Sequence, residues 1–213
     1  MEMGPVTFVE DFLMSTLKAK KVVVGEDYTF AKGGKSDVSF LKKYEGKDFE
    51  VIITDEVKFH NEKISSSTIR KDIKEGKFDL VNKSLGRAYK IKGEVVNGYK
   101  RGSKMGFPTA NIDLSFSYVL PKNGVYITKT YICDKEYYSL TNIGFNPTFN
   151  LESKKIESYI LDFSENIYGE YIEVEFIEFL RDEIKFDNKN DLINQMIIDE
   201  KITREKINIY KDY

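Results

Sequence analysis

The arrangement of apolar residues changes near residue 87, and this change limits the fold more than any other feature of the chain. Before it, apolar residues at helical spacing alternate with short continuous apolar runs, such as KKVVVG and FEVIIT. Strands of a parallel sheet give such runs because helices cover both faces of the sheet. Alternating helices and strands of this kind predict an α/β region with a parallel sheet over residues 1–86.

Beyond residue 87 the chain consists mainly of segments with the character of strands. They are rich in β-branched and aromatic residues, and Gly, Asn or Asp separates them. The segments are YKIKGEVV, GVYITKTYI, EYYSLTNI, KIESYILDF and YIEVEFIEFL. This spacing predicts an antiparallel barrel or sandwich over residues 87–213. Near its end, Leu192, Ile193, Met196 and Ile197 recur as one stripe and predict a C-terminal helix.

The composition limits the partners and sites that this chain can have. The formal net charge is −2, so no basic excess favours nucleic acid or an anionic membrane. No apolar run is long enough to cross a bilayer. Cys133 is the one cysteine, which excludes an intrachain disulfide and favours a reducing cytoplasm. His60 is the one histidine, so this chain has no multi-histidine metal site; its polar surroundings favour a solvated loop residue.

Spaced glycines alternate with cations in the stretch KGEVVNGYKRGSKMGFPTANI. The glycines are Gly93, Gly98, Gly102 and Gly106, and the cations are Lys100, Arg101 and Lys104. Glycine lets a backbone turn sharply and approach a ligand closely, and cations between the glycines suit a polyphosphate. The alternative interpretation of this stretch is a β-hairpin with a flexible, basic loop.

The same stretch ends in Thr109 and Asn111, which are two residues apart at the start of a predicted strand. Their side chains therefore face the same side of the sheet. Together they offer a hydroxyl oxygen and an amide carbonyl oxygen. Mg²⁺ prefers such hard oxygen ligands and completes its shell with water and substrate phosphates. The alternative is that both are ordinary turn and edge residues.

This stretch resembles the ATP-binding signature of the riboflavin kinase family, a glycine-rich flap that leads into Pro-Thr-Ala-Asn. Further segments match the family in the same order: LPKNGVYI, TNIGFNPTF, IESYILDF and the ending from IYGEYIEVEF onward. The resemblance covers residues 87 to about 205. It implies a six-stranded antiparallel Greek-key barrel with a C-terminal helix. It also implies transfer of the γ-phosphoryl group of ATP to the 5′-hydroxyl of riboflavin, giving FMN.

The resemblance also implies roles for particular residues. The four glycines, Lys100, Thr109 and Asn111 would bind ATP, and the last two would also bind Mg²⁺. Glu157 would be the general base that takes the proton of the hydroxyl group. Glutamate is uncommon in strands, so its presence within IESYIL supports a special role. The family often has a histidine two residues further on, where this chain has Tyr159.

Two further residues are candidates for flavin binding, Asn142 within TNIG and Arg181 within LRDE. The guanidinium group of Arg181 could instead pair with the C-terminal helix, or form an ion pair with Asp182 or Glu183.

The front of the chain resembles the rear part of the FMN adenylyltransferase module of bacterial bifunctional FAD synthetases. VVVGEDYTFAKGGKSD and ISSSTIR carry this resemblance. In the second motif Ser65, Ser66 and Arg70 would hold an ATP phosphate at a helix N-terminus. The alternative is a capped helix start without a ligand. The His-x-Gly-His signature of that module is not in this chain, so we expect it to precede residue 1 and do not expect adenylyltransferase activity here.

Three functions follow from these observations. The first is an ATP-dependent riboflavin kinase. The second is a bifunctional FAD synthetase whose front part this chain lacks. The third is a non-catalytic flavin-binding module, against which Thr109, Asn111 and Glu157 together argue.

Overall fold

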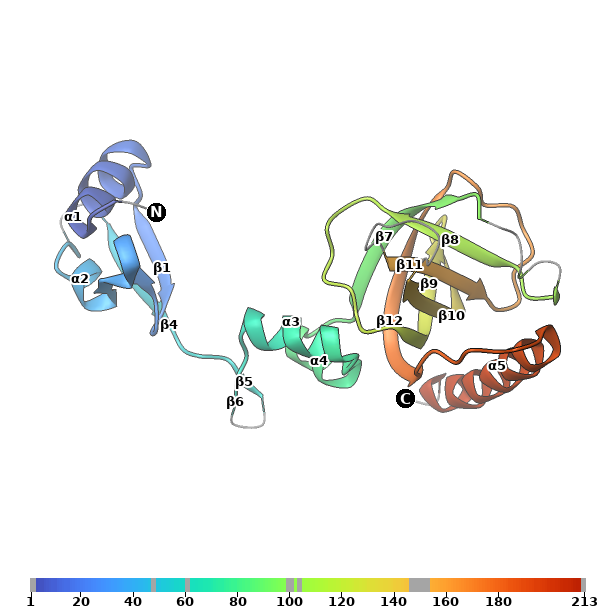
Figure 1. Ribbon diagram of the computed structural model, residues 1–213. Coiled ribbons are helices and arrows are strands. Elements are labelled where there is room, and N and C mark those ends of the chain that lie inside the picture. The colour runs from blue at the N-terminus through green and yellow to red at the C-terminus, as the bar shows by residue number, and fades with distance from the viewer. Residues whose placement is uncertain are drawn as a thin grey trace. The chain divides into compact units, whose positions relative to one another are not determined.

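A computed structural model of the protein describes residues 3–46, 49–59, 62–98, 102, 105–145 and 154–211 (Figure 1). Its internal contacts divide the chain into two compact units, unit 1 at Met1–Ile64 and unit 2 at Ser65–Tyr213. Within the described residues, no helix is both long enough and apolar enough to span a membrane.

Unit 1 is built on a parallel pair of strands, which confirms the predicted parallel sheet. β1 (Lys21–Gly25) pairs with β4 (Glu50–Thr54), with Val24 beside Ile53. The other elements are α1 (Pro5–Thr7), the π-helical η1 (Phe8–Thr16), β2 (Thr29–Phe30), the 3-10 turn η2 (Lys32–Gly34), β3 (Ser36–Asp37), α2 (Val38–Lys42), β5 (Lys58–Phe59) and β6 (Glu62–Lys63). The core of unit 1 consists of Phe8, Val9, Leu13, Val24, Phe30, Val38, Leu41, Phe49 and Val51.

Unit 2 contains a closed antiparallel barrel, as the sequence predicted. Its strands are β7 (Tyr89–Val96), β8 (Thr109–Leu114), β9 (Gly124–Ile132), β10 (Lys135–Phe145), β11 (Lys154–Ile160) and β12 (Tyr171–Arg181). They follow the spatial order β10-β11-β8-β7-β12-β9 and close on themselves. The consecutive strands β9, β10 and β11 lie side by side, and β12 returns beside β9. This connection is a Greek key.

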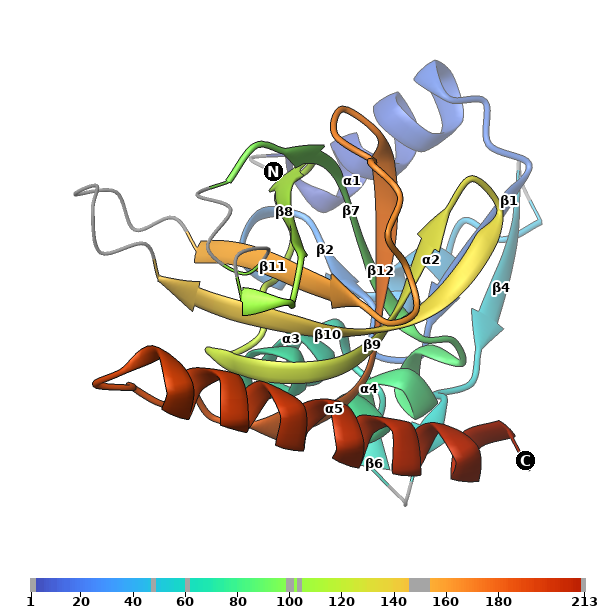
Figure 2. The same cartoon turned by 90° about the vertical axis from the view of Figure 1, so that its right-hand side faces the viewer.

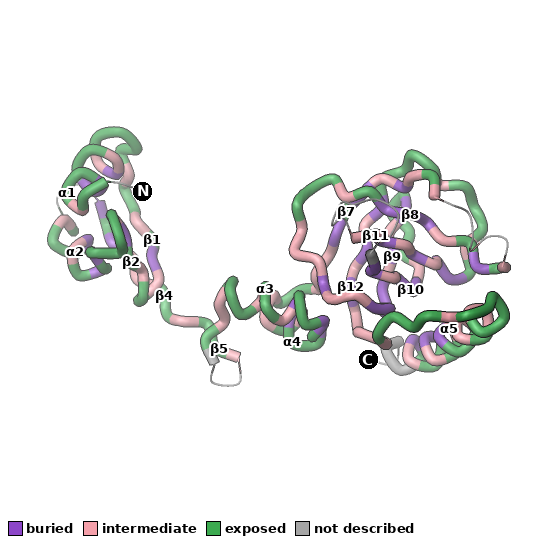
Figure 3. Tube along the Cα trace, viewed as in Figure 1, coloured by how far each residue is buried: buried purple, intermediate pink, exposed green. Residues whose placement is uncertain are grey.

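The alternation of side chains along β11 decides which residues face the barrel interior. Ile156, Ser158 and Ile160 are buried inside, with exposed fractions of 5% or less. Lys155, Glu157 and Tyr159 alternate with them and face outward because successive strand residues point to opposite sides. Figure 3 shows buried and partly exposed residues alternating along the barrel strands.

The barrel interior also contains a chain of buried hydroxyl groups. Thr128, Thr130, Ser139, Thr141 and Ser158 are fully buried. The Thr128 hydroxyl lies 2.7 Å from that of Ser139 and 2.8 Å from that of Thr141, which donates to Ser158 at 3.1 Å. If the pairing register of a strand shifted by one residue, its hydroxyl groups would turn outward and its buried apolar side chains would lose their burial. The hydroxyl groups therefore help to fix the register of β9, β10 and β11.

Two helices before the barrel pack against it. They are α3 (Ser66–Glu75) and α4 (Phe78–Leu85). The Phe78 ring is 1% exposed and stacks on Phe176 at a centroid distance of 4.8 Å. The Asn82 side chain donates to the Phe176 carbonyl at 2.8 Å and accepts from the Tyr89 backbone N–H at 2.9 Å. The compact unit thus begins at Ser65, whereas the strand pattern begins near residue 87, where we expected the boundary.

The predicted C-terminal helix is present as α5 (Lys189–Lys211), which lies along one side of the barrel (Figure 2). Its barrel face includes Asp199, which is 3% exposed and accepts from Arg181, and Thr203 and Ile207, which are buried. Ile197 is 53% exposed, so the expected stripe is wrong at this position. The reason is that the ion pair of Asp199 with Arg181 helps to set which face of the helix turns to the barrel.

Candidate active site

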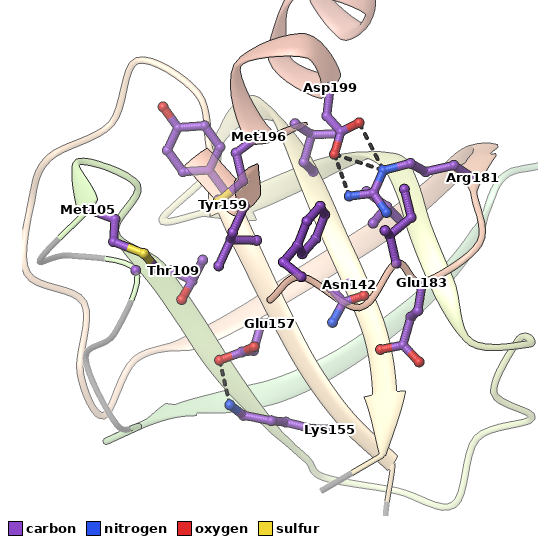
Figure 4. A pocket seen from close by; sticks show the side chains of 16 residues that line it. Met105, Thr109, Asn142, Lys155, Glu157, Tyr159, Arg181, Glu183, Met196 and Asp199 are labelled. Carbon is purple, nitrogen blue, oxygen red and sulfur yellow. Dashed lines mark hydrogen bonds and ion pairs between the residues drawn. The ribbon is translucent and has the colours of Figure 1, made fainter. Parts of the chain in front are cut away.

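A cavity of about 400 Å³ lies between the outer face of the barrel and α5 (Figure 4). Its lining residues are Gly102, Met105, Thr109, Val125, Leu140, Asn142, Lys155, Glu157, Tyr159, Arg181, Glu183, Ile184, Phe186, Leu192, Met196 and Asp199. The polar members gather on the barrel strands, and many of the apolar members come from α5 and the segment before it. The cavity therefore has a charged floor and an apolar wall.

Glu157 is at the centre of the charged floor. In the register of the sheet it lies opposite Asn142 of β10 and opposite Asn111 of β8. Opposed side chains of an antiparallel pair share one face, with Cβ atoms about 4.5–5.5 Å apart. A carboxylate thus lies between two amides in a row across three strands. One Glu157 oxygen, Oε1, lies 2.6 Å from the Lys155 ammonium nitrogen (Figure 4).

Thr109 and Asn111 share the same face at the start of β8, as predicted from their spacing, but only Thr109 of the two is among the residues that line the cavity. Asn111 is 9% exposed, and its Oδ1 atom has no hydrogen-bond partner within the described part of the chain. An unsatisfied buried acceptor costs about 1–3 kcal/mol, which a cation or donor at this position would recover. An orphaned amide oxygen beside a hydroxyl fits a hard divalent cation. Among the described residues, no cluster of three or more His, Cys, Asp or Glu side chains offers another metal site.

Two of the predicted glycines lie close to these residues. A Cβ atom on Gly98 would lie 2.1 Å from the Asn111 side-chain nitrogen. A Cβ atom on Gly102 would lie 2.3 Å from the Phe107 carbonyl oxygen and 3.4 Å from the Thr109 hydroxyl. Only glycine leaves this room, so the loop backbone can approach the start of β8 closely.

The other members of the glycine-rich stretch are placed differently. Gly93 lies within β7, where a Cβ atom would lie 2.2 Å from the Asp113 carbonyl oxygen of β8. It therefore allows close strand packing. Gly106 has φ of +86°, which favours glycine, and faces open space. Lys100 lies outside the described residues, as do Arg101 and Lys104.

The two candidate flavin residues have different surroundings. Asn142 lines the cavity directly beside Glu157. Arg181 also lines it, but its guanidinium donates to both carboxylate oxygens of Asp199 at 2.6–3.0 Å. This pair realises the predicted contact with the C-terminal helix. In the described structure Arg181 forms its ion pair with Asp199 in place of Asp182 or Glu183, and it also donates to the Asp182 backbone carbonyl.

Tyr159 connects β11 to its surroundings. Its hydroxyl donates to Glu200 of α5 at 3.2 Å, and its ring meets the Phe107 ring at 5.2 Å, edge to face. Burial, reinforced by the Glu200 carboxylate, raises the pKa of the Tyr159 phenol. The residue in the histidine position of the family thus joins β11, α5 and the loop before β8.

Sequence reasoning missed three charged residues of the cavity, Lys155, Glu183 and Asp199. The signal for Lys155 was its position two residues before Glu157 on one strand, which puts both on one face. Glu183 accepts from Asn123 at 3.1 Å and occupies the space that Gly144 leaves, where a Cβ atom would lie 2.3 Å from its Oε1. No pattern in the sequence indicates this contact.

A second cavity of about 190 Å³ shares one lining residue with the first, Thr109. Its other lining residues are Val95, Pro108, Ala110, Ile160, Phe163, Ser164, Glu165, Asn166, Ile167 and Tyr168.

The residues of the ISSSTIR motif lie at the start of α3 and line neither cavity. The Ser65 hydroxyl accepts from the Thr68 backbone N–H at 3.1 Å, and Arg70 donates to the Ser66 hydroxyl at 3.1 Å. These contacts form the capped helix start that was the alternative interpretation.

Comparison with known proteins adds the family to this geometry. Residues 85–207 match the family model described as riboflavin kinase, which is more than half of the chain. The chain belongs to the riboflavin kinase family. Residues 1–68 match the model described as FAD synthetase. The limits of the two models lie near the domains expected from the sequence, 1–86 and 87–213, which stay a prediction.

Several curated relatives are similar to almost the whole chain. The bifunctional riboflavin kinase/FMN adenylyltransferase of Listeria monocytogenes is 41% identical over 95% of this chain and 65% of its own length. The protein of the same name from Bacillus subtilis is 33% identical over 99% of this chain and 66% of its own length. This chain therefore spans just under two thirds of the length of these relatives.

A solved structure shares the fold of the chain. It is a Streptococcus pneumoniae protein described as a macrolide-efflux protein, with a TM-score of 0.86 and 36% sequence identity. The match covers 95% of this chain and 66% of the other. The likeness shows a shared fold, whereas membership of the riboflavin kinase family rests on the match to residues 85–207.

Proposed function

We propose that unit 2 is a riboflavin kinase that transfers the γ-phosphoryl group of ATP to the 5′-hydroxyl of riboflavin, giving FMN and ADP. The observation that carries the proposal is the row of Asn111, Glu157 and Asn142 across three strands, with Thr109 on the same face. Phosphoryl transfer depends on positioning and charge neutralisation more than on covalent chemistry. This row provides a base and phosphate or metal ligands on one rigid wall.

The larger cavity suits the flavin. Its volume of about 400 Å³ is within the usual range for small-molecule sites, about 300–1,000 Å³. Leu192 and Met196 of α5, with Phe186, provide an apolar wall for the ring system. Asn142 beside Glu157 would bind the polar part of the flavin. The Arg181 guanidinium serves chiefly to hold α5, because Asp199 occupies it.

The smaller cavity, of about 190 Å³, is below the usual range for small-molecule sites and would hold only part of the nucleotide. A bisubstrate site needs two compartments that meet where the phosphoryl group passes, and Thr109 is common to both cavities. The glycine-rich stretch with Gly98 and Gly102 lies at the same place, close to Asn111 and Thr109. With Lys100 it would approach the phosphates of ATP.

Thr109 and Asn111 would also hold Mg²⁺, through the hydroxyl oxygen and the orphaned Oδ1 atom. The bound cation would neutralise charge on the phosphates. The remaining ligands would be phosphate oxygens and water.

Glu157 acts as the general base in this proposal. The riboflavin hydroxyl oxygen forms a bond to the γ-phosphorus while the bond from that phosphorus to the β–γ bridging oxygen breaks. The bridging electron pair leaves with ADP, and the hydroxyl proton passes to the Glu157 carboxylate. Such a base contributes about 10²–10⁴-fold to the rate.

Incubation with riboflavin, ATP and Mg²⁺, followed by chromatography of the flavins, tests the proposal. We expect FMN. Bound riboflavin with no FMN would indicate a non-catalytic flavin-binding module and contradict the kinase. FAD would support a second candidate, the bifunctional enzyme, which the match of residues 1–68 to FAD synthetase favours.

We also propose that the protein acts on small molecules in the cytoplasm, without nucleic acid or membrane. The net charge of −2 and the single Cys133 support this.

A further inference from the structure

Lys155 is a charged residue of the main cavity to which neither the sequence motifs nor the proposed reaction has assigned a role. It lies two residues before Glu157 on β11, and both side chains face the cavity (Figure 4). Its ammonium nitrogen is 2.6 Å from Glu157 Oε1, and the two side chains are 30% and 27% exposed. The residue opposite Lys155 on β10 is Gly144, and the Glu183 side chain fills the space that this glycine leaves.

The charges of the cavity make this ammonium group important. Among the described lining residues, the acidic groups are Glu157, Glu183 and Asp199, and the cations are Lys155 and Arg181. Arg181 is engaged by Asp199 through three hydrogen bonds. Lys155 is therefore the cation beside the carboxylate that acts as base.

Phosphoryl transfer creates a charge problem at this position. A base must lie next to the attacking hydroxyl, so the negative γ-phosphoryl group approaches a negative carboxylate. Like charges at this separation repel strongly where water is partly excluded. A cation on the Thr109 and Asn111 side would neutralise the group from one direction. The Glu157 side would need a cation of its own.

We propose that Lys155 is a further catalytic residue, whose ammonium group contacts the γ-phosphoryl group of the nucleotide and neutralises charge on it during transfer. The proposal rests on the proposed kinase function. It adds a phosphate-binding cation on β11, outside the glycine-rich stretch.

The distances allow this contact. The attacking hydroxyl would lie about 2.6–3.2 Å from the Glu157 carboxylate, and the phosphorus about 3–3.5 Å from that hydroxyl. The ammonium group is already 2.6 Å from the same carboxylate. It has three N–H donors, so one can stay on Glu157 while another donates to a phosphoryl oxygen. Rotation about the terminal bonds of the lysine supplies the remaining movement.

The competing interpretation is an ordinary strand ion pair. Partly exposed pairs of this kind add little to stability, and replacing the lysine would then have little effect on turnover. Lys90 provides a matched control, because it pairs with Glu175 at 3.1 Å on the same barrel but does not line the cavity.

The test compares Lys155→Met, Lys155→Arg and Lys90→Met in the full chain by steady-state kinetics. For Lys155→Met we expect kcat to fall about 10²-fold, the usual loss for one transition-state charge stabiliser, with the KM for riboflavin within about twofold. Lys155→Arg keeps the charge and should recover part of the rate. Lys90→Met should match the wild type.

A binding measurement separates this proposal from the kinase function itself. Calorimetric titration compares Mg-ADP with Mg-AMPPNP, the analogue in which NH replaces the β–γ bridging oxygen. Lys155→Met should weaken AMPPNP binding about tenfold and leave ADP binding within about twofold, because only AMPPNP has a γ-phosphoryl group. Thermal unfolding of each variant checks that the barrel is intact.

Each outcome decides one of the two proposals. A kcat within threefold of wild type, or equal weakening of both nucleotides, would overturn the role of Lys155. A wild-type chain that makes no FMN would overturn the kinase function, while selective loss of AMPPNP binding would still support the contact of Lys155 with a γ-phosphoryl group. Failure of the wild type to bind either nucleotide would overturn both.

Discussion

Units 1 and 2 both bury apolar residues against a sheet, but only one of the sheets is closed. In unit 2 each of the six strands has two neighbours, and the barrel has no free edge. In unit 1 the described parallel sheet has two strands, β1 and β4, and Val23 on β1 is 59% exposed. The candidate site lies on the closed sheet, where every strand is held from both sides. The comparison teaches that the candidate site lies in the unit whose strands are all paired on both sides.

Replacement of Glu157 tests whether the candidate site on the closed sheet performs the proposed reaction, and it has the largest expected effect. Glu157→Gln should lower kcat by about 10²–10⁴-fold, because the amide cannot accept the hydroxyl proton. Riboflavin binding, measured by fluorescence titration, should persist. Glu173→Gln on β12 is the control, since Glu173 is 42% exposed and lines neither cavity. Wild-type turnover in Glu157→Gln would remove the base from the proposal.

A core replacement in α4 tests whether the helices before the barrel belong to unit 2. Phe78→Ala should lower the free energy of unfolding by about 3–5 kcal/mol, because the ring is 1% exposed and stacks on Phe176. Urea denaturation followed by circular dichroism measures the change. The control Phe116→Ala, at a site 66% exposed, should change it by less than about 0.5 kcal/mol. Equal effects would separate α4 from the barrel core.

Removal of the buried ion pair tests what holds α5 over the cavity. Asp199→Asn should cost about 3 kcal/mol of stability, because it leaves the Arg181 guanidinium without its charged partner. It should also weaken riboflavin binding, since Leu192 and Met196 of the same helix line the cavity. Asp182→Asn, where the side chain is 77% exposed, is the control. Unchanged riboflavin affinity in Asp199→Asn would mean that α5 is held by other contacts.

Hydrogen exchange tests the difference in stability between the units directly. We expect amides of residues 3–64 to exchange before those of the barrel, because a two-stranded sheet holds its backbone hydrogen bonds less securely. Amides of α3 and α4 should exchange with the barrel, because both helices belong to unit 2. Mass spectrometry of peptic peptides gives the protection of each segment, and equal protection of both units would contradict the comparison.

Alkaline pH should lower the stability of unit 2 through the ionisation of Tyr131. This is the smallest effect among the five predictions. Burial, with Glu175 adding to it, raises the pKa of Tyr131 to about 12. The folded state then holds the proton more tightly than the unfolded state, whose tyrosine pKa is about 10. The contribution of Tyr131 to the free energy of unfolding is therefore fully present below pH 10 and falls as the pH rises toward 12. Tyr131→Phe should flatten the fall in the urea midpoint between pH 9 and about 11, and an unchanged slope would argue against it.

Much of the fold was predictable because its causes are local. β-branched and aromatic segments between turns indicated an antiparallel barrel or sandwich, and the spacing of Leu192 and Met196 indicated α5. The burial of a helix face, however, does not say what it packs against. The packing of α4 on Phe176 is a contact between residues distant in the sequence, and the strand pattern at residue 87 could not indicate it.

The site was predictable where two residues share one strand and not where strands meet. Thr109 and Asn111 lie on one face because of their spacing alone. The position of Glu157 opposite Asn111 and Asn142 depends on the register of three strands, which the sequence does not specify. The sequence indicated that Arg181 could contact the C-terminal helix but not that Asp199 is its partner. Apolar periodicity ignores a charged residue on a buried helix face.

The central claim is that one wall of the barrel holds a metal-bound triphosphate against an alcohol beside a carboxylate. The most direct measurement is transfer of label from [γ-³²P]ATP in a single turnover with riboflavin in excess. The account predicts labelled FMN at the rate of ATP loss, with the transfer slowed at least about 10²-fold in Glu157→Gln. Label released only as inorganic phosphate, or no transfer while both ligands are bound, would contradict it.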